Sequence, residues 1–392
     1  MLVERIRIRG DMKIAMSGLI SEQNFGDPII ERSAKWVYRD VCRRLGIDDV
    51  DWADVDLDVE KTGGFVFYGC RVARKLNLLW LLKVFVFILS FRYEKILRGC
   101  RFGVISGGGL FHYKYLNCAY GVGAFIVACR RRRMPVIVNP VGVEGFDAKD
   151  IKCRLLKWCV NFENVMAIMV RDDEETMQEY YLTKNRSRLL GLAYDPAVFS
   201  CKLITDSGIR KDNVVGIGLM RDGRFADFSD RDYAQEMVLF YVRVANEFDK
   251  KNVRYEFFTN GLGRDLALVS GIEKGLGRKI KVYVPKSSEE LLQYIASLSG
   301  VIGFRMHSLI ISYSFDIPAV AVAWHDKIRR WMSLIGCLDD MMTIDKLDAS
   351  FAVNRIVYRM KLGGYNQKMR FELEKTHCDK VAEAVRRSLL VA

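Results

Sequence analysis

The chain has 392 residues, and its 61 basic and 48 acidic side chains give a net charge of +13. Half of the residues are hydrophobic, only six are proline and no tract is of low complexity, which excludes an extensively disordered protein. The length suggests two or three domains of roughly 150 residues each. The first ten residues are too charged for a secretory signal, and the ten cysteines lack zinc-type spacing. We therefore expect a cytoplasmic protein with free thiols.

Short apolar runs alternate with longer amphipathic segments in the first half of the chain, which is typical of βα units and a parallel sheet. Strands are predicted at residues 13–17, 65–68, 102–105, 136–139 and 165–170. Helices are predicted at residues 28–45, 117–133 and 173–182. Pro28 suits a first helical turn because its missing N–H would have no intrahelical partner there.

A second series of the same kind follows residue 200. Its predicted strands span residues 214–220, 254–258, 279–284, 300–304 and 319–323, and a terminal helix spans about 366–390. Ser287 or Ser288, followed by two glutamates, marks another helix start. The sequence thus predicts an α/β protein with two Rossmann-like domains, residues 1–203 and 204–392, facing each other across a central cleft. Ligands are expected at the carboxyl ends of the strands, in this cleft.

Positive charge is concentrated in residues 71–101, where eight basic side chains accompany one acid, Glu94. Within this segment, residues 78–91 (LLWLLKVFVFILSF) are almost entirely apolar. Fourteen helical residues span about 21 Å, short of the ~30 Å hydrocarbon core, so a transmembrane helix is not expected. A helix lying on an anionic membrane surface fits this composition, and a buried core helix or an oligomer interface fits it nearly as well. No nucleic-acid-binding motif accompanies the charge, so nucleic acid is not an expected partner.

A loop and a helix start follow the first predicted strand, in the sequence SGLISEQNFGDPII. Gly18 and Gly26 permit close backbone approach, and Asn24 and Asp27 supply polar groups at the helix entrance. Asp27 either caps the helix, which is the commoner role, or faces the cleft and accepts a proton from a substrate hydroxyl.

Two further strand ends carry candidate ligand-binding groups. One strand is followed by three glycines, Gly107, Gly108 and Gly109. They let the backbone approach a ligand or turn sharply, although they lack the spacing of a dinucleotide site or a P-loop. Arg171 ends another strand and precedes four acids. It either pairs with one of them or binds a phosphate or carboxylate in bidentate fashion.

The most distinctive segment is GVIGFRMHS at residues 300–308. An apolar strand ends here at Arg305 and His307, and a helix follows at once. A guanidinium, an imidazole and helix N-terminal amides around one point form an anion site with a proton donor. His325 and Lys327, after the next strand, are expected near the same edge. No metal site is predicted.

Taken together, these segments resemble the polysaccharide pyruvyl transferase family. The matching motifs, in the family's order, are NFGD (24–27), SGGGL (106–110), VRDDE (170–174), DPAVF (195–199), GFRMHS (303–308) and IPAVAV (317–322). They cover most of the chain, from residue 13 to about 335. The basic apolar insertion at 71–101 and the tail after residue 340 depart from the family's pattern and leave the acceptor open.

The resemblance implies a GT-B-like fold and the transfer of pyruvate from phosphoenolpyruvate (PEP) to two hydroxyls of a sugar, which forms a ketal and releases phosphate. The implied acceptor is a bacterial surface-polysaccharide precursor, often lipid-linked. The resemblance also assigns the handling of PEP to Arg305 and His307, with Met306 and Ser308 in the same substrate-binding segment. Since the methylene carbon of PEP must be protonated, His307 is the expected acid.

The two anionic groups of PEP require at least two cations, so Arg305 and Arg171 are expected to bind them, with Lys327 as a third. Asp27, beside Asn24, is expected to orient or deprotonate an acceptor hydroxyl. Closure of the two domains would align the substrates and exclude water. Neither a metal nor a cofactor is expected.

Two other functions fit the same features. A GT-B-type glycosyltransferase could use the cationic strand ends for a nucleotide-sugar diphosphate, and a non-catalytic scaffold of glycan assembly could use the basic apolar segment. For a pyruvyl transferase we expect a peripheral location at the inner face of the plasma membrane.

Overall fold

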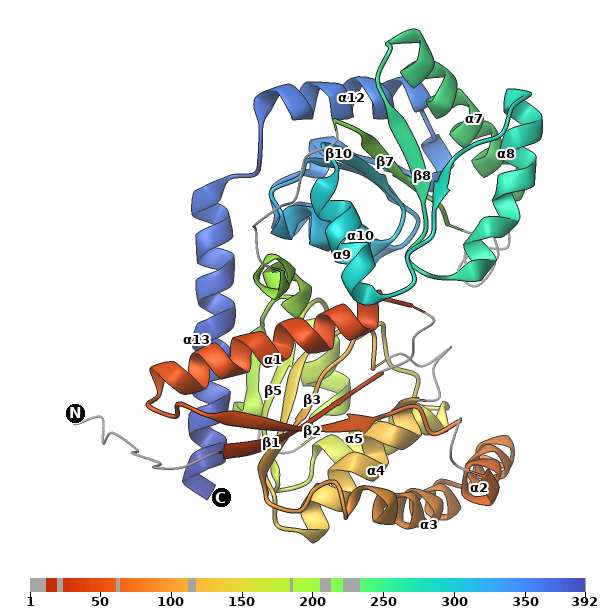
Figure 1. Ribbon diagram of the computed structural model, residues 1–392. Coiled ribbons are helices and arrows are strands. Elements are labelled where there is room, and N and C mark those ends of the chain that lie inside the picture. Colours follow the sequence, from red (N-terminus) through yellow and green to blue (C-terminus); the bar gives the residue numbers. More distant parts are fainter. Residues whose placement is uncertain are drawn as a thin grey trace. The chain divides into compact units, whose positions relative to one another are not determined.

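A computed structural model describes residues 12–19, 24–60, 64–111, 118–183, 186–204, 213–220 and 233–391. The chain forms two compact units (Figure 1). The first comprises the described parts of Met1–Ser21, Ile30–Pro196 and Leu373–Ala392, and the second those of Glu22–Ile29 and Ala197–Glu372. The chain thus enters the second unit briefly after its first strand and returns to the first unit in its terminal helix. The predicted domain boundary at residue 203 divides the chain only once, so it includes neither of these two crossings between the units.

The six strands of the first sheet are all parallel and lie in the order β2-β1-β3-β4-β5-β6. They are β1 (Met12–Gly18), β2 (Val50–Asp56), β3 (Cys100–Ile105), β4 (Val136–Val141), β5 (Val165–Val170) and β6 (Leu189–Leu192). The helices are most of α1 (Gly26–Arg44), α2 (Gly64–Lys75), α3 (Leu79–Ser90), α4 (Cys118–Arg131), α5 (Ile151–Val160), the short α6 (Glu174–Thr176) and most of α13 (Gln367–Val391). Helix α1 covers one face of the sheet and α4 the other (Figure 1). The strand order reverses between β1 and β3, which makes their carboxyl ends a switch point.

The second sheet is also parallel, in the order β12-β11-β10-β7-β8-β9. Its strands are β7 (Val215–Gly218), β8 (Tyr255–Phe258), β9 (Val282–Tyr283), β10 (Gly300–Gly303), β11 (Ala319–Ala323) and β12 (Met341–Thr343). Its helices are α7 (Ala234–Lys250), α8 (Val269–Leu276), α9 (Ser288–Ser297), α10 (Met306–Ser314), α11 (Asp326–Leu334) and α12 (Ala349–Leu362). Helices α7 and α12 pack together on one face, while α9 and α10 pack on the other (Figure 1). This order reverses between β7 and β10.

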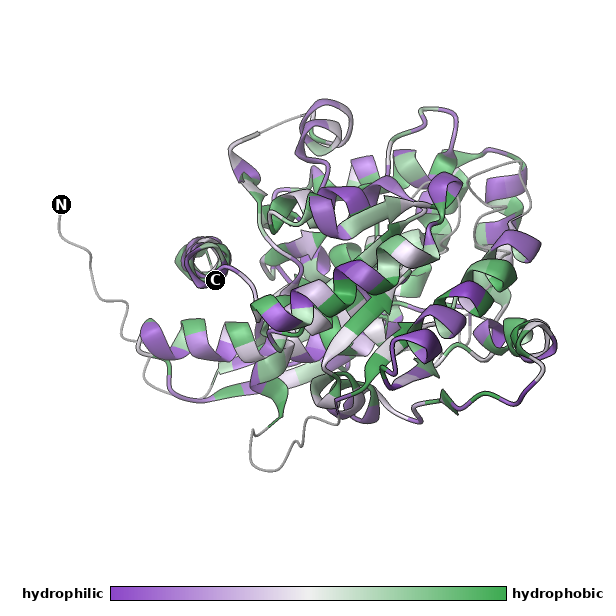
Figure 2. Ribbon diagram, turned by 90° about the horizontal axis from the view of Figure 1, so that it is seen from above, coloured by the Kyte–Doolittle hydropathy of each residue, from purple (hydrophilic) through white to green (hydrophobic). Residues whose placement is uncertain are grey.

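These two sheets confirm the predicted α/β fold with two Rossmann-like units. Figure 2 shows the pattern that made it readable: the strands are largely hydrophobic, whereas the helices alternate hydrophobic and hydrophilic residues. Strand β4, for example, is buried along its whole length, as expected for a central parallel strand with helices on both faces. The predicted helix start at Ser287 is confirmed, since its side chain accepts a hydrogen bond from the Glu290 N–H at 3.1 Å.

In the first unit, one predicted strand is wrong and two strands, β2 and β6, were not predicted. The strand predicted at residues 65–68 is wrong, because this segment begins helix α2. A four-residue apolar run has no readable period, and here Phe65 is 82% exposed. Strand β2 was not predicted, because its sequence VDWADVD is rich in acids. Its buried residues Val50, Ala53 and Val55 are nevertheless separated by the exposed acids Asp51 and Asp54, as in a half-buried edge strand.

The predicted helix at residues 78–91 is confirmed as α3. Among the described residues, no helix has the length and apolar character needed to cross a membrane.

Candidate active site

The carboxyl end of β10 lies at the switch point of the second sheet, where parallel α/β folds bind ligands. Arg305 is the N-cap residue of α10 and has an extended backbone conformation, and His307 is the second residue of the helix. The Ser308 hydroxyl donates a 2.7 Å hydrogen bond to the Arg305 carbonyl oxygen. The first turn of α10 therefore holds Arg305 and His307 at the amino end of the helix, where backbone N–H groups and the helix dipole favour anions.

Arg305 is held in place by a buried carboxylate that the sequence did not single out, Asp265. The Arg305 Nε and Nη2 atoms donate to the two carboxylate oxygens at 3.0 and 2.6 Å. The side chains of Arg305 and Asp265 are 12% and 0% exposed. Asp265 belongs to a short helical turn, Gly263–Leu268, which follows β8. This two-point pair fixes the plane of the guanidinium, and Nη1 takes no part in it. In the sequence, the only feature that could have identified Asp265 as a site residue is its position in the loop that follows a predicted strand.

His307 contacts the helix start that follows β1. An added Cβ atom on Gly26 would lie 2.1 Å from His307 Nδ1, so only glycine fits against the imidazole in this position. Next to it, the Phe25 N–H donates to the Asn260 carbonyl oxygen at 3.2 Å, and the Phe25 ring covers Gly261. These contacts anchor residues 24–29 in the second unit.

Asn24 and Asp27 therefore lie in the same unit as His307. The predicted domain boundary at residue 203 had placed them in the N-terminal domain instead. Asp27 is in the first turn of α1, where a carboxylate complements the helix dipole. Its Oδ2 accepts a hydrogen bond from Asn24 Nδ2 at 3.1 Å, and its N–H donates to the Asn24 carbonyl oxygen at 3.2 Å. The helix-start role of Asp27 is present in the structure; its action on a hydroxyl stays a prediction.

Lys327 follows the adjacent strand end. β10 and β11 are neighbours in the sheet, and Trp324 Nε1 donates to the Phe304 carbonyl oxygen at 2.7 Å, which joins the segments that follow the two strands. The side chain of His325 caps α11 by accepting from the Lys327 N–H at 3.2 Å. Lys327 Nζ lies 5.4 Å from the centroid of the Trp324 ring. Arg305, His307 and Lys327 thus occupy consecutive strand ends, as predicted from their spacing.

The predicted glycine loop lies in the first unit, at the switch point between β1 and β3. It comprises Gly107, Gly108 and Gly109, directly after Ser106. The Ser106 N–H donates to the Ser17 carbonyl oxygen at 2.7 Å, and the Gly142 N–H donates to that of Gly108 at 2.8 Å. An added Cβ on Gly109 would lie 2.9 Å from a carboxylate oxygen of Glu144. Close packing inside the unit therefore explains this glycine without a ligand.

Arg171 is buried in the first unit, with 4% of its side chain exposed. Its Nη1 pairs with the carboxylate of Asp195, and its Nε lies 3.8 Å from Asp172 Oδ2. Burial opposes the charge of Arg171, but these carboxylates outweigh burial and raise its pKa. Two of the sequence motifs, VRDDE and DPAVF, thus meet in one buried ion pair. A ligand-binding role for Arg171 stays a prediction.

A further carboxylate at the first switch point, Glu31, was not predicted. An added Cβ on Gly18 would lie 3.0 Å from Glu31 Oε2. Burial raises the pKa of Glu31, although Lys35 Nζ, 2.8 Å from its Oε1, acts in the opposite direction. Lys35 also pairs with Asp54 at 2.6 Å. The Glu31 and Lys35 spacing of four residues on one helix was the available signal.

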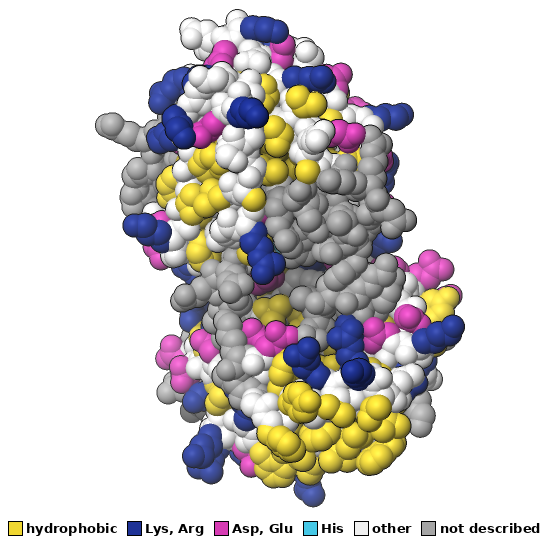
Figure 3. All heavy atoms as spheres, turned by 90° about the vertical axis from the view of Figure 1, so that its right-hand side faces the viewer, with side chains coloured by type: hydrophobic (Ala, Val, Ile, Leu, Met, Phe, Trp, Pro, Cys, Tyr) yellow, Lys and Arg dark blue, Asp and Glu magenta, His cyan; other side chains and the backbone are white. Residues whose placement is uncertain are grey.

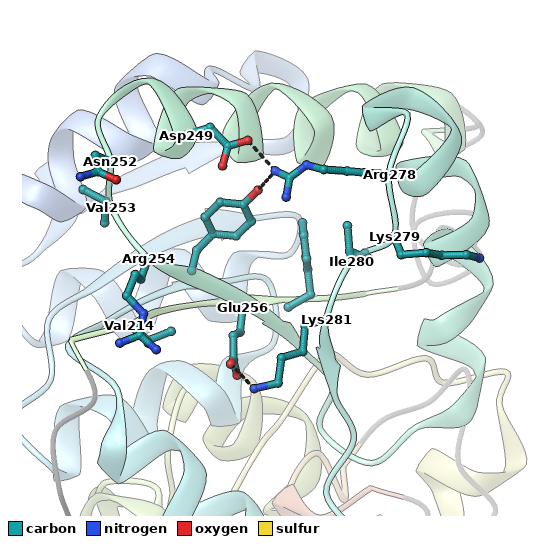
Figure 4. A pocket seen from close by; sticks show the side chains of 12 residues that line it. Val214, Asp249, Asn252, Val253, Arg254, Glu256, Arg278, Lys279, Ile280 and Lys281 are labelled. Carbon is teal, nitrogen blue, oxygen red and sulfur yellow. Dashed lines mark hydrogen bonds and ion pairs between the residues drawn. The ribbon is translucent and has the colours of Figure 1, made fainter.

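A hollow of about 480 Å³ in the second unit lies at the opposite edge of the sheet, by the amino ends of β7, β8 and β9 (Figure 4). Its charges are largely paired within its own lining. Arg278 donates to Asp249 at 2.5 Å and to the Tyr255 hydroxyl at 2.6 Å, and Lys281 Nζ lies 2.5 Å from Glu256 Oε1. Such pairing leaves little uncompensated charge for an anion, so the β10 edge is the better candidate.

The family model for polysaccharide pyruvyl transferases matches residues 35–326, most of the chain. The chain belongs to the polysaccharide pyruvyl transferase family. Arg171, Arg305 and His307 lie within the matched range, whereas Asp27 and Lys327 lie just outside it. A comparison with curated proteins finds no match to this pyruvyl transferase.

Solved structures of similar fold include two UDP-N-acetylglucosamine 2-epimerases and one protein in complex with UDP. A UDP-N-acetylglucosamine 2-epimerase described as putative, from Listeria monocytogenes, has a TM-score of 0.56 at 7% identity, over 96% of this chain and 91% of its own. The S. aureus MnaA–UDP structure has a TM-score of 0.53 at 8% identity, with coverage of 95% and 94%. The UDP-GlcNAc 2-epimerase of Methanocaldococcus jannaschii has a TM-score of 0.53 at 11% identity, with coverage of 90% and 92%. At such low identity, these similarities support the GT-B-like fold alone.

Proposed function

We propose that this pyruvyl transferase uses PEP as its donor and forms a pyruvate ketal on two hydroxyls of a sugar in a surface-polysaccharide precursor. The observation that carries the proposal is the placement of Arg305 and His307 together in the first turn of α10. One group is a fixed cation for an anionic donor, and the other is a titratable acid beside it. PEP needs both.

The proposed reaction begins with protonation of the PEP methylene carbon by His307, which gives C2 oxocarbenium character. One sugar hydroxyl attacks C2, the C2–O bond to phosphate breaks, and the second hydroxyl closes the ketal. The methylene gains one proton and becomes a methyl group, while the two hydroxyls lose one proton each. One of these protons restores His307, and the other leaves with the phosphate.

Arg305 is the proposed main ligand for the donor. Because Asp265 takes Nε and Nη2, Nη1 is the nitrogen proposed to reach a phosphate or carboxylate oxygen. The amides at the amino end of α10 would share this anion, with Met306 and Ser308 lining the same segment. Lys327 would supply a second cation from the next strand end. Ligand-binding roles for Arg171 and for glycines 107–109, which belong to the first unit, remain proposals.

Asp27 and Asn24 are the proposed acceptor-side groups. A carboxylate in the same unit as His307 could take the proton of an attacking hydroxyl, while Asn24 orients that carboxylate. We propose a lipid-linked saccharide as the acceptor and the inner face of the plasma membrane as the location.

Phosphate release tests this function. We expect it to require both PEP and a lipid-linked saccharide, and we expect nucleotide sugars not to replace PEP. Turnover of a nucleotide sugar without PEP would instead support a glycosyltransferase. Failure of PEP to protect the protein in thermal unfolding, together with no turnover, would support a non-catalytic scaffold.

A further inference from the structure

Helices α2 and α3 of the first unit expose a large apolar surface. They pack tightly together, since an added Cβ on Gly69 would lie 2.3 Å from the Phe85 ring. Their inner side chains, such as Leu82 and Val86, are fully buried. Exposed apolar side chains of α2, of α3 and of the segments directly after each helix form what we call the α2–α3 apolar surface: Phe65, Tyr68, Leu76, Trp80, Val84, Phe87, Ile88, Phe91 and Ile96. Figure 3 shows it as one continuous hydrophobic area. This surface is not part of the unit's own core.

Basic side chains accompany this apolar surface. The exposed basic side chains of this segment include Arg71, Arg74, Lys75, Arg92, Lys95 and Arg98. The acid of the segment, Glu94, is paired with Arg131, whose Nη2 lies 2.7 Å from Glu94 Oε1. The Arg131 guanidinium also stacks over the Phe91 ring at 3.6 Å. The segment therefore combines exposed apolar side chains with an excess of basic over acidic side chains.

We propose that the α2–α3 apolar surface docks on an anionic lipid membrane. Apolar side chains would enter the boundary between headgroups and acyl chains, and the basic side chains would contact the anionic headgroups. Trp80 and Tyr68 suit this layer because each has an apolar body and a polar tip. The helices lie on the membrane without crossing it. This proposal does not depend on the identity of the donor.

Charge argues against a second copy of the chain as the occupant. A two-fold interface places the same patch of both subunits face to face, so the basic side chains of one copy would meet those of the other. Opposed like charges oppose association, whereas an anionic surface is complementary to them.

Vesicle sedimentation of the full chain tests this surface. We expect binding to vesicles that contain phosphatidylglycerol, little binding to pure phosphatidylcholine, and weaker binding at high salt. The double variant Trp80→Ser/Phe87→Ser should bind on the order of tenfold or more weakly, because two large apolar side chains no longer insert. Leu239→Ser/Phe371→Ser removes two comparably exposed apolar side chains from the second unit and should bind like the wild type.

The charge is tested in the same assay. Arg92→Gln/Lys95→Gln should weaken binding about fivefold per charge removed, while Lys250→Gln/Lys251→Gln, at the end of α7, should not. Thermal unfolding of each variant checks that it is folded. Absence of binding to anionic vesicles would overturn the proposal. It would also be overturned if the control variants lost as much vesicle binding as the variants of the α2–α3 apolar surface. A dimer in sedimentation equilibrium that Trp80→Ser/Phe87→Ser abolishes, without vesicle binding, would also overturn it.

Discussion

Gly26 lies directly against the imidazole of His307, so closely that a methyl group on Gly26 would come within 2.1 Å of His307 Nδ1. The two residues are 281 positions apart in the sequence, yet they belong to the same unit. The segment after the first strand therefore forms one wall of the proposed donor site. It also brings Asp27 into the unit that carries His307.

Replacing Gly26 tests this contact directly. Gly26→Ala should move the imidazole by several tenths of an ångström or more and reduce turnover on the order of 100-fold, since small displacements of a catalytic group are expensive. The fold should survive, because the backbone of Gly26 is not in the left-handed region. Gly263→Ala is the matched control: the added methyl group meets open space, and turnover should stay normal. Equal turnover of the two variants would contradict the proposed role of this contact.

His307→Ala should leave a folded protein with turnover reduced by a factor on the order of 10²–10⁴, the usual contribution of a general acid. Steady-state phosphate release measures the loss, and thermal unfolding checks the fold. Near-normal turnover would remove His307 from the mechanism.

Asp265→Asn should weaken the binding of PEP by loosening Arg305. The amide cannot accept both of the hydrogen bonds that Nε and Nη2 now donate. We expect KM for PEP to rise about tenfold or more, with a smaller change in kcat. Asp340→Asn is a suitable control, because Asp340 is also a buried partner of arginines, at the amino end of β12. Asp340→Asn should lower the free energy of unfolding and leave KM for PEP unchanged. A similar KM for PEP in both variants would refute the positioning role of Asp265.

Arg171→Leu should lower the free energy of unfolding by about 3–5 kcal/mol, because it leaves the carboxylate of Asp195 buried without its cation. Denaturant titration measures this loss. Arg130→Leu removes an exposed ion pair to Glu163 in the same unit and should cost under about 1 kcal/mol. A loss of similar, small size in both variants would contradict the structural role of the Arg171 pair.

The protein should lose stability at mildly acidic pH through His377. This residue of α13 is fully buried, and burial lowers its pKa from 6.5 to about 4. Below pH 6.5 the unfolded chain binds a proton at this position that the folded protein does not bind. The free energy of unfolding should therefore fall as the pH drops from about 6.5 to about 4, by at most ~1.4 kcal/mol per pH unit from this group. His377→Gln should have a flatter pH dependence in denaturant titrations; an unchanged slope would exclude His377 as the cause.

Much of the fold could be predicted from the sequence because hydrophobic residues recur with different periods in buried parallel strands and in amphipathic helices. The predicted strands at 102–105 and 319–323 match β3 and β11 closely. Strand β2 was missed because its acids obscured its alternation, and residues 65–68 were misread because a short apolar run does not distinguish a strand from an exposed helix face. The hydrophobic pattern of a segment does not show which apolar side chains of a helix stay exposed to solvent.

The candidate site was only partly predictable for a similar reason. Arg305, His307 and Lys327 follow adjacent strands, so their spacing placed them at one edge. The partners Asp265 and Gly26 come from distant segments and meet them only through tertiary packing. Asp195, the partner of Arg171, is also 24 residues away. The four acids directly after Arg171 are its expected partners from the sequence, and Asp195 is not among them.

The most direct test of the central claim is mass spectrometry of lipid-linked saccharides after incubation with the protein and PEP. The account predicts an acceptor that gains one pyruvate less one water, with an equal amount of phosphate released, and no such product with His307→Ala. An acceptor that stays unmodified across a broad panel, or one that instead gains a sugar from a nucleotide sugar, would contradict it.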